Sequence, residues 1–400
     1  MTRTNIHICG AGGIGTSGLA LLYRELGLRV TATDARESEI TQLLRKSGIE
    51  VDTKPRAEWA SEAELLVVPS IFPQDHPEVK AARDHHVPVL SRTEALLRLC
   101  AESHCDPVIC TGTLSRALCA ALIAGSLKDC GYCLGLSENS APHARFARQM
   151  VIDLDERELA AHAALLSPFE SLSVLVSDWA QDPLGYYDES FDLKCFIDAV
   201  SPHAKTLVFP DGDGFSMRRD ATTTHVALNV SMQKTENAIS VGGIRFSQPP
   251  MTLSDASAAA AAALFIDGPV HAANPTGWFQ VMDERRTFDI RMHPVSVRNA
   301  VQSLKTRFVG EPVTVVIKPY ASTLNAYDVN TWRKAFSGAL AVYVMTPGYN
   351  ATDKDCRKLS TALKLRGLCS ATYPKKQMLD ECHAFVGHQL WLGAPDMFKP

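Results

Sequence analysis

Apolar residues nowhere form a run long enough to cross a membrane. The longest stretch, ASAAAAAALFI at residues 256–266, falls well short of the roughly 18 to 20 residues that a transmembrane helix needs. Positive charge is not in excess, because 40 Lys and Arg face 44 Asp and Glu. That balance provides no general basic surface for nucleic acid or an anionic membrane. The N-terminal residues also lack the apolar core of a secretory signal, so we expect a cytoplasmic protein.

Cysteine pairs with regular spacing are also missing. The 11 cysteines are odd in number and scattered, which is typical of reduced thiols and not of a disulfide framework. Cys130 and Cys133 form the motif CGYC, without the second CxxC that a four-cysteine zinc site needs. We therefore predict that both are small core residues, and we assign no metal site.

Predicted strands and helices alternate along almost the whole chain. Short apolar runs such as NIHIC and ELLVV alternate with amphipathic stretches, which is typical of a parallel, doubly wound sheet. The alternation returns after HCDP near residue 105 and again after the linker-like segment DGPVHAANPTG. A chain of 400 residues suits two or three domains. We predict an α/β protein of three domains, at residues 1–105, 106–267 and 268–400, the first and last Rossmann-like.

The first glycine loop, GAGGIG at residues 10–15, lies between a predicted strand and a predicted helix. Gly10 allows the tight turn, Gly12 allows a pyrophosphate to approach the backbone, and Gly15 allows close packing of helix and strand. Asp34 follows about 20 residues later, at the end of the second strand, where dinucleotide enzymes hold a ribose. The pattern predicts a site for a dinucleotide or a nucleotide-sugar. It leaves an NAD(P)-dependent oxidoreductase open as one interpretation.

The second glycine loop lies in VICTGTLSRALCAALIAG, which begins at residue 108. A helix N-terminus after a tight turn favours a phosphate, because its N–H groups and its dipole both attract an anion. A working nucleotide loop also needs a second glycine, a lysine and a Ser or Thr for Mg²⁺. The corresponding positions hold Ser115, Arg116 and Ala117, although Gly112 and Thr113 are in place. The sequence therefore predicts the remnant of a nucleotide loop.

Three stretches together resemble the Mur ligase family: IHICGAGGIGTSGLALLYRELGLRVTATD, VVPSIFPQDHPEVKAARDHHVPVLSRTEAL and VICTGT. Members of that family have a UDP-sugar-binding first domain, a central ATPase domain and a C-terminal α/β domain. They use ATP and Mg²⁺ to activate a carboxylate. The resemblance implies a P-loop ATPase-like central domain at residues 106–267. It also implies that UDP-N-acetylmuramate or a related UDP-sugar is bound by Gly10, Gly12, Gly13, Ile14, Gly15, Thr16, Ser17, Asp34, Ser70 and Arg92.

The central domain departs from the family pattern wherever ATP chemistry needs a group. Arg116 replaces the loop lysine, and Ala117 has no oxygen for Mg²⁺. Asp178 and Pro183 stand where the family has an asparagine and a histidine near the metal. Removing one group that stabilises a transferring phosphoryl costs on the order of 10² to 10³ in rate. We therefore predict a non-catalytic homologue of the members that join L-alanine to a UDP-sugar, acting as a sensor or scaffold with a protein partner.

A divergent active ligase stays open as a second interpretation. In it, Arg116 serves as the phosphate cation, while Asp153, Glu156 and Asp182 hold Mg²⁺. ATP and Mg²⁺ are cofactors in this interpretation alone. The acid run DLDERE, which contains Asp153 and Glu156, is otherwise typical of a solvated helix start. For the oxidoreductase interpretation, the sequence offers only His293 in RMHP, a lone histidine without a catalytic partner beside it.

Overall fold

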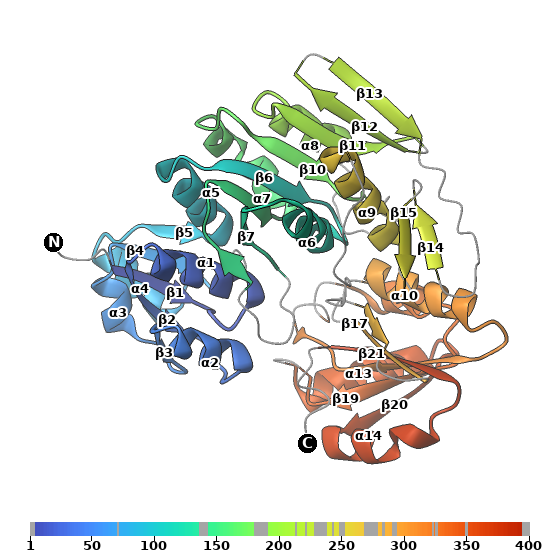
Figure 1. The fold of residues 1–400 in the computed structure, drawn as a ribbon. Coiled ribbons are helices and arrows are strands. Elements are labelled where there is room, and N and C mark those ends of the chain that lie inside the picture. The colour runs from blue at the N-terminus through green and yellow to red at the C-terminus, as the bar shows by residue number, and fades with distance from the viewer. Residues whose placement is uncertain are drawn as a thin grey trace.

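The computed structural model of the chain shows three α/β units that follow one another along the sequence (Figure 1). It describes residues 5–69, 72–135, 143–179, 191–212, 214–220, 222–227, 238–241, 244–247, 253–267, 279–281, 285–289, 294–321, 324, 327–348 and 351–393. Within these ranges, no helix has the length and apolar character that crossing a membrane requires. The predicted fold class is confirmed, and the boundaries at residues 105 and 267 stay predictions.

The first unit is a five-stranded parallel sheet in the order β3-β2-β1-β4-β5. Its strands are β1 (Asn5–Cys9), β2 (Arg29–Thr33), β3 (Glu50–Asp52), β4 (Leu65–Val68) and β5 (Val89–Ser91). Its helices are α1 (Ile14–Glu25), α2 (Glu39–Lys46), α3 (Ala57–Ser61), α4 (Pro77–Asp84) and α5 (Arg92–Glu102). The chain leaves the central strand β1 toward β2 on one side and later adds β4 on the other. Ligands of such sheets bind beyond the carboxyl ends of the strands at this switch point, where the first glycine loop lies.

The second unit has an eight-stranded sheet in the order β13-β12-β11-β10-β6-β9-β7-β8. Its strands are β6 (Asp106–Thr111), β7 (Gly131–Cys133), β8 (Ala144–Arg145), β9 (Gln149–Asp153), β10 (Ser173–Val176), β11 (Thr206–Asp211), β12 (Gly214–Arg219) and β13 (Thr222–Ala227). Its helices are α6 (Arg116–Ser126), α7 (Glu156–Ala161), η1 (Ala163–Leu166), α8 (Leu193–Val200) and α9 (Leu253–Ile266). A separate two-stranded sheet pairs β14 (Ala238–Val241) with β15 (Ile244–Ser247). β6 runs parallel to both neighbours, β9 and β10, and leads into the second glycine loop.

The third unit has a six-stranded sheet in the order β16-β17-β21-β18-β19-β20. Its strands are β16 (Phe279–Val281), β17 (Arg286–Asp289), β18 (Val313–Ile317), β19 (Ala341–Thr346), β20 (Cys369–Pro374) and β21 (His388–Leu392). Its helices are α10 (Pro294–Arg307), α12 (Val329–Ala335), α13 (Asp353–Lys364), α14 (Lys375–Glu381) and η2 (Cys382–Ala384). Only β16 runs antiparallel to its neighbour, so this unit repeats the mainly parallel design of the first.

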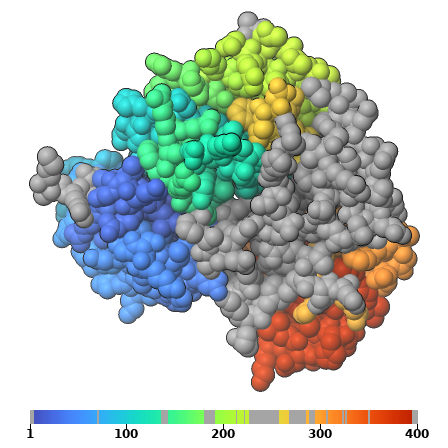
Figure 2. All heavy atoms as spheres, in the orientation of Figure 1, coloured from blue at the N-terminus to red at the C-terminus, as the bar shows by residue number. Residues whose placement is uncertain are grey.

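A single hydrophobic core joins the first two units. Its buried members include Leu19 and Leu22 of α1, Leu96 of α5, and Met150 and Ile152 of β9. In Figure 2 the blue surface of the first unit adjoins the green surface of the second. Burying a leucine or methionine side chain stabilises a fold by about 1.5 to 3 kcal/mol. Apolar burial therefore holds α1, and with it the first glycine loop, against the sheet of the second unit.

Candidate functional site

The first glycine loop turns sharply out of β1 and opens α1. Gly10 has a φ of +64°, in the left-handed region that glycine adopts without strain. Thr16 donates from its hydroxyl to the Gly10 carbonyl oxygen at 2.6 Å. The Ser17 hydroxyl donates to the Gly13 carbonyl oxygen at 2.9 Å. α1 begins at Ile14 without a side-chain cap at Gly13, so its positive dipole end is suited to an anionic ligand.

Asp34 closes one side of this loop. Its Oδ2 accepts a hydrogen bond from the Gly12 N–H at 2.8 Å, and its Oδ1 accepts one from the Arg36 N–H at 3.0 Å. A Cβ atom at position 12 would lie 2.8 Å from the Asp34 carboxyl carbon, so this close approach requires glycine. Asp34 thus shapes the loop, which weakens the ribose-binding role that the oxidoreductase interpretation gives it.

Arg92, the first residue of α5, places a positive charge beside the first glycine loop. A Cβ atom at Gly15 would lie 2.8 Å from the Arg92 Nε. The Arg92 Nη1 donates to the main-chain oxygen of Asp153 at 2.9 Å, and Nη2 lies 3.7 Å from the Asp153 carboxylate. The buried Nε has no hydrogen-bond partner among the described residues. The Arg92 guanidinium thus places positive charge near the uncapped start of α1.

Thr16 and Ser17, both predicted to line the UDP-sugar, are buried. The Ser17 Oγ lies 2.7 Å from Nε2 of His143, which precedes β8 in the central unit. Burial lowers the pKa of His143 to about 4, so its ring is neutral at neutral pH. The structure places Ser17 in the contact between the first two units. For Thr16 and Ser17, contact with a sugar stays a prediction.

An internal carboxylate occupies the second glycine loop, residues 112–115. The N–H of Leu114 donates to both carboxylate oxygens of Asp178, at 3.0 and 3.3 Å. The N–H of Ser115 donates to Oδ1 at 3.1 Å, and the Ser177 hydroxyl donates to the same oxygen at 2.8 Å. Asp178 follows β10 and is only 6% exposed. The carboxylate therefore takes backbone donors of the kind that bind a phosphate in this type of loop.

Gly112 makes this arrangement possible. Its φ of +135° lies outside the range that other residues readily adopt. A Cβ atom there would lie 2.5 Å from the Ser177 Oγ and 2.8 Å from the Asp178 Oδ1. The Thr113 N–H also donates to the Asp178 main-chain oxygen, at 3.4 Å. The second glycine loop is thus fitted closely to the end of β10.

Arg116, at the start of α6, is surrounded by acids. Its Nε lies 3.9 Å from Asp153, its Nη2 3.9 Å from Asp155 and its Nη1 3.8 Å from Glu156. The Gly135 N–H also donates to Asp153 at 2.6 Å. The acid run does begin a helix, α7, but the prediction that it is solvated is wrong, because Asp153 and Glu156 are both buried. Pairing with a guanidinium makes this burial tolerable.

The predicted residues thus gather at two places. The first loop contains Gly10, Gly12, Gly13, Ile14 and Gly15 and lies beside Asp34 and Arg92. The second loop lies beside Arg116, Asp153 and Glu156. Ser70, Asp182 and His293 lie outside the described residues, and their roles stay predictions.

Sequence reasoning missed two features of these sites. It treated Asp178 as a lost asparagine and gave it no contact with the loop, although SD at the end of a predicted strand places a carboxylate at the phosphate-binding edge of the sheet. It also overlooked His7, Cys9 and Glu78, which the fold brings together inside the first unit. For His7 and Cys9 the signal was available in the triplet HIC, because residues two apart on a strand share a face. For Glu78 it was available in the triplet HPE.

Known proteins with similar sequences are ligases. Residues 5–104 match the family model described as Mur ligase family, catalytic domain. A UDP-N-acetylmuramate–L-alanine ligase of Geobacter sp. (strain M21) is 26% identical over 392 residues, which cover 86% of this chain and 83% of the relative. The enzyme of the same name from Clavibacter michiganensis subsp. michiganensis is 30% identical over 217 residues, covering 52% of this chain and 44% of its own.

The similarity in fold extends over the whole chain. The crystal structure of a UDP-N-acetylmuramate–alanine ligase from Thermotoga maritima matches with a TM-score of 0.68 at 18% identity, over 99% of this chain and 96% of that one. Because the fold is shared at such low identity, it shows the three-domain α/β architecture and no activity. Residues 5–104 are therefore similar to the Mur ligase family, and the chain is similar, over most of its length, to a UDP-N-acetylmuramate–L-alanine ligase.

Proposed function

We propose that this chain binds UDP-N-acetylmuramate or a related UDP-sugar at the first glycine loop and does not catalyse ATP-dependent ligation. It acts as a sensor or scaffold in peptidoglycan precursor synthesis, together with a protein partner. The observation that carries this proposal is the Asp178 carboxylate, which accepts hydrogen bonds from the Leu114 and Ser115 N–H groups of the second loop.

The position of Asp178 opposes nucleotide binding for two reasons. A phosphate that entered the loop would have to displace a buried carboxylate from donors that already satisfy it. The displaced carboxylate would then lie beside the incoming phosphate, and the two negative charges would repel in a site of low dielectric. Hydrogen bonds to a charged group contribute about 1.5 to 3 kcal/mol each, so the internal arrangement is hard to displace.

The residues around Arg116 do not fit a magnesium nucleotide either. Mg²⁺ prefers an octahedron of oxygen ligands, several of them water. Here the guanidinium already supplies a positive charge to Asp153, Asp155 and Glu156, all within 4 Å. A divalent cation would have to enter beside that fixed charge. In this chain Asp178 therefore occupies the place where the family binds phosphate, and Arg116 occupies the place where acids would hold the metal.

The first loop supports the other half of the proposal. α1 begins without a side-chain cap, and the buried Nε of Arg92 beside Gly15 lacks a partner within the described residues. These donors suit the diphosphate of a UDP-sugar.

The cluster of acids around Arg116 favours a divergent ligase as a second candidate. Asp153, Asp155 and Glu156 bring three carboxylates to the mouth of the second loop. If Arg116 swings toward a phosphate, Asp153 and Glu156 become available to a metal ion, as the active-ligase interpretation requires.

Calorimetric titration separates the two candidates. The full-length chain is titrated with UDP-N-acetylmuramate, and separately with ATP in the presence of Mg²⁺. The proposal expects binding of the sugar nucleotide alone. ATP binding, followed by phosphate release when UDP-N-acetylmuramate and L-alanine are added, establishes the divergent ligase instead.

A further inference from the structure

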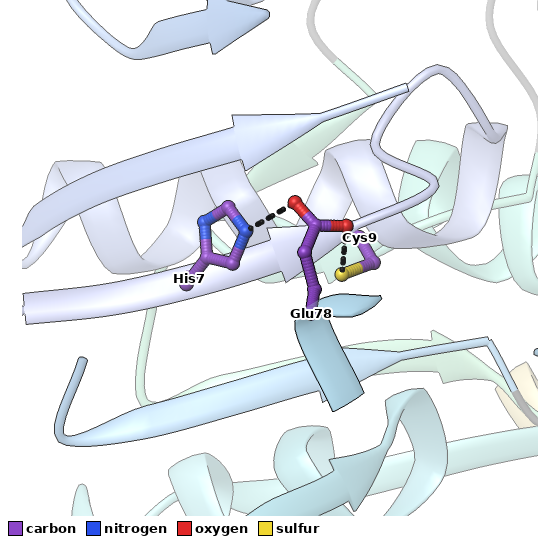
Figure 3. A group of neighbouring side chains, drawn as sticks. All are labelled: His7, Cys9 and Glu78. Atoms are coloured by element: carbon purple, nitrogen blue, oxygen red, sulfur yellow. Dashed lines mark hydrogen bonds and ion pairs between the residues drawn. The ribbon is translucent and has the colours of Figure 1, made fainter. Parts of the chain in front are cut away.

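A cluster of nitrogen, sulfur and oxygen donors lies inside the first unit, next to the first loop, because Cys9 directly precedes Gly10. His7 and Cys9 are two residues apart on β1, so they point to the same face of the sheet. Glu78, the second residue of α4, reaches between them, as Figure 3 shows. One ligand atom from each residue lies within 4.8 Å of the others, and all three side chains are at most 1% exposed.

The Glu78 carboxylate is fully used by its nearest donors. Oε1 lies 3.1 Å from the His7 Nε2 and accepts from the Arg56 N–H at 2.8 Å. Oε2 accepts from the Cys9 thiol at 3.2 Å and from the Thr33 hydroxyl at 3.1 Å. A carboxylate has about four acceptor sites, so these four contacts fill it.

His76 brings a fifth donor atom to the same carboxylate. Its Nδ1 lies 3.3 Å from the Glu78 Oε2. This nitrogen is buried and has no hydrogen-bond partner in the part of the chain that the structure describes. An aromatic contact with Phe72, at 4.6 Å between ring centroids, holds the ring in place. The cluster thus contains one more inward-facing nitrogen than hydrogen bonding to Glu78 can satisfy.

The surroundings of His7 suit a metal-bound imidazole. Its Nδ1 lies 3.2 Å from the main-chain oxygen of Thr31 and 2.9 Å from the Thr31 hydroxyl. In the neutral tautomer with its proton on Nδ1, the ring donates to the Thr31 carbonyl oxygen and presents the lone pair of Nε2 to a metal ion beside Glu78. Histidines that bind metals commonly donate their other N–H to a backbone carbonyl in this way.

We propose that the His7 Nε2, the Cys9 Sγ and a Glu78 oxygen bind one zinc ion, and that the His76 Nδ1, which lies beside Glu78, turns toward the ion as the fourth ligand. Two nitrogens, a thiolate sulfur and a carboxylate oxygen are a donor set that Zn²⁺ accepts in tetrahedral geometry, whereas Mg²⁺ and Ca²⁺ prefer oxygen alone. The charges also balance, because a thiolate and a carboxylate neutralise a dication in this buried place. Zinc displaces the thiol proton of Cys9 to solvent when it binds. Four protein ligands leave no open position, so the site is structural and joins β1 to the start of α4.

Metal uptake by the full-length chain tests this proposal. The protein is treated with a chelator, reduced, and titrated with Zn²⁺ alone and with Co²⁺ alone, with stoichiometry measured by native mass spectrometry. Cys9→Ser is compared with Cys105→Ser, a buried cysteine outside the cluster. We expect one metal per chain and a thiolate-to-Co²⁺ charge-transfer band in the wild type and in Cys105→Ser, and loss of the band in Cys9→Ser. No stoichiometric metal in the wild type, or an equal band in both variants, overturns the proposal.

A second pair of variants tests the fourth ligand without disturbing β1. His76 is 23% exposed, and His85 lies exposed at the other end of α4. His76→Ala should weaken zinc binding by at least about tenfold, while His85→Ala should leave it unchanged. Equal affinity in both variants removes His76 from the ligand set and contradicts the four-ligand site. Neither experiment uses a sugar nucleotide, so its failure leaves the proposed function standing.

Discussion

The two glycine loops share a strand, a turn and a helix but differ in what meets the helix N-terminus. Neither α1 nor α6 has a side-chain cap at its N-cap residue, and at the first loop the Arg92 guanidinium lies beside Gly15. At the second loop, the Asp178 carboxylate accepts from the Leu114 and Ser115 N–H groups. Similar backbone geometry is therefore combined with a nearby guanidinium in one unit and with an internal carboxylate in the other. The side chain that arrives from a neighbouring strand decides between these outcomes.

The charged side chains at the two loops also differ in how they are paired. Asp34 accepts from one N–H of the first loop, that of Gly12, whereas Asp178 accepts from two N–H groups of the second loop, those of Leu114 and Ser115. In the second unit, Arg116 pairs with Asp153, Asp155 and Glu156. Among the described residues, Arg116 and its acidic neighbours pair with one another, and Asp178 has its N–H donors, so our proposal expects little electrostatic gain for a bound magnesium nucleotide.

Removal of the internal carboxylate should have the largest effect. Asp178→Ala leaves the Leu114 and Ser115 N–H groups without their acceptor and should lower the free energy of unfolding by about 3 to 5 kcal/mol. The same variant should bind ATP more tightly than the wild type, because the N–H groups of the second loop become available to a phosphate. Chemical denaturation and calorimetry measure the two effects. Asp198→Ala, on the exposed face of α8, is the matched control and should change stability by less than about 0.5 kcal/mol. An unchanged stability in Asp178→Ala contradicts the role given to this carboxylate.

The contact between the first two units should weaken in acid. Burial lowers the pKa of His143 from 6.5 to about 4, so between these values the unfolded chain binds a proton that the folded chain does not. Stability from this group is therefore complete above pH 6.5 and is lost as the pH falls toward 4, by at most about 3 kcal/mol. Denaturation curves across this range measure the slope. His143→Gln keeps a polar partner for Ser17 and should flatten the slope, whereas an equal slope in the variant assigns it to other groups.

A side chain in the first loop should abolish binding of the UDP-sugar. At position 12 a Cβ atom would lie 2.8 Å from Asp34, and a second carboxylate would repel both Asp34 and the diphosphate. Gly12→Asp should weaken binding of UDP-N-acetylmuramate by more than about 100-fold, or about 2.7 kcal/mol. Gly212→Asp carries the same change of charge at a turn with φ of +59° and open space around the Cβ, and it should bind normally. Equal affinity in the two variants moves the sugar site elsewhere.

The smallest effect should come from the cation beside the first loop. Arg92→Lys keeps a positive charge near Asp153 but removes the Nε–H that lies next to Gly15. We expect binding of UDP-N-acetylmuramate to weaken about tenfold, which corresponds to 1.4 kcal/mol. Arg98→Lys, exposed on the same helix, serves as the control in the same calorimetric titration. Unchanged affinity in Arg92→Lys shows that the unpartnered Nε does not meet the ligand.

Local pattern was enough to predict the elements that carry the two loops. β1, α1, β6 and α6 follow from short apolar runs, glycine turns and amphipathic stretches, and all four lie where the sequence predicts them. The short strands β7, β8 and β20 have no such signal, because their pairing depends on neighbours distant in the chain. CGYC was predicted to be core, and Cys130 and Cys133 are indeed buried in or next to β7.

The site was less predictable than the fold, because its decisive contacts are long-range. Asp178 is 63 residues from Ser115, and His143 is 126 residues from Ser17. The sequence shows that Asp178 stands where the family it resembles has an asparagine. Only the packing of β10 beside β6 shows where the Asp178 carboxylate lies. The same reasoning explains the acid run, whose pairing with Arg116 reverses the solvated environment that its composition indicates.

Titration of the wild-type chain with ATP and Mg²⁺ in a calorimeter, beside the same titration with UDP-N-acetylmuramate, tests the difference between the loops most directly. We predict heat of binding with the UDP-sugar and none with ATP, since Asp178 satisfies the second loop while the first remains suited to a diphosphate. Saturable ATP binding by the wild type would contradict this account, because it would show that the carboxylate yields its place to a phosphate.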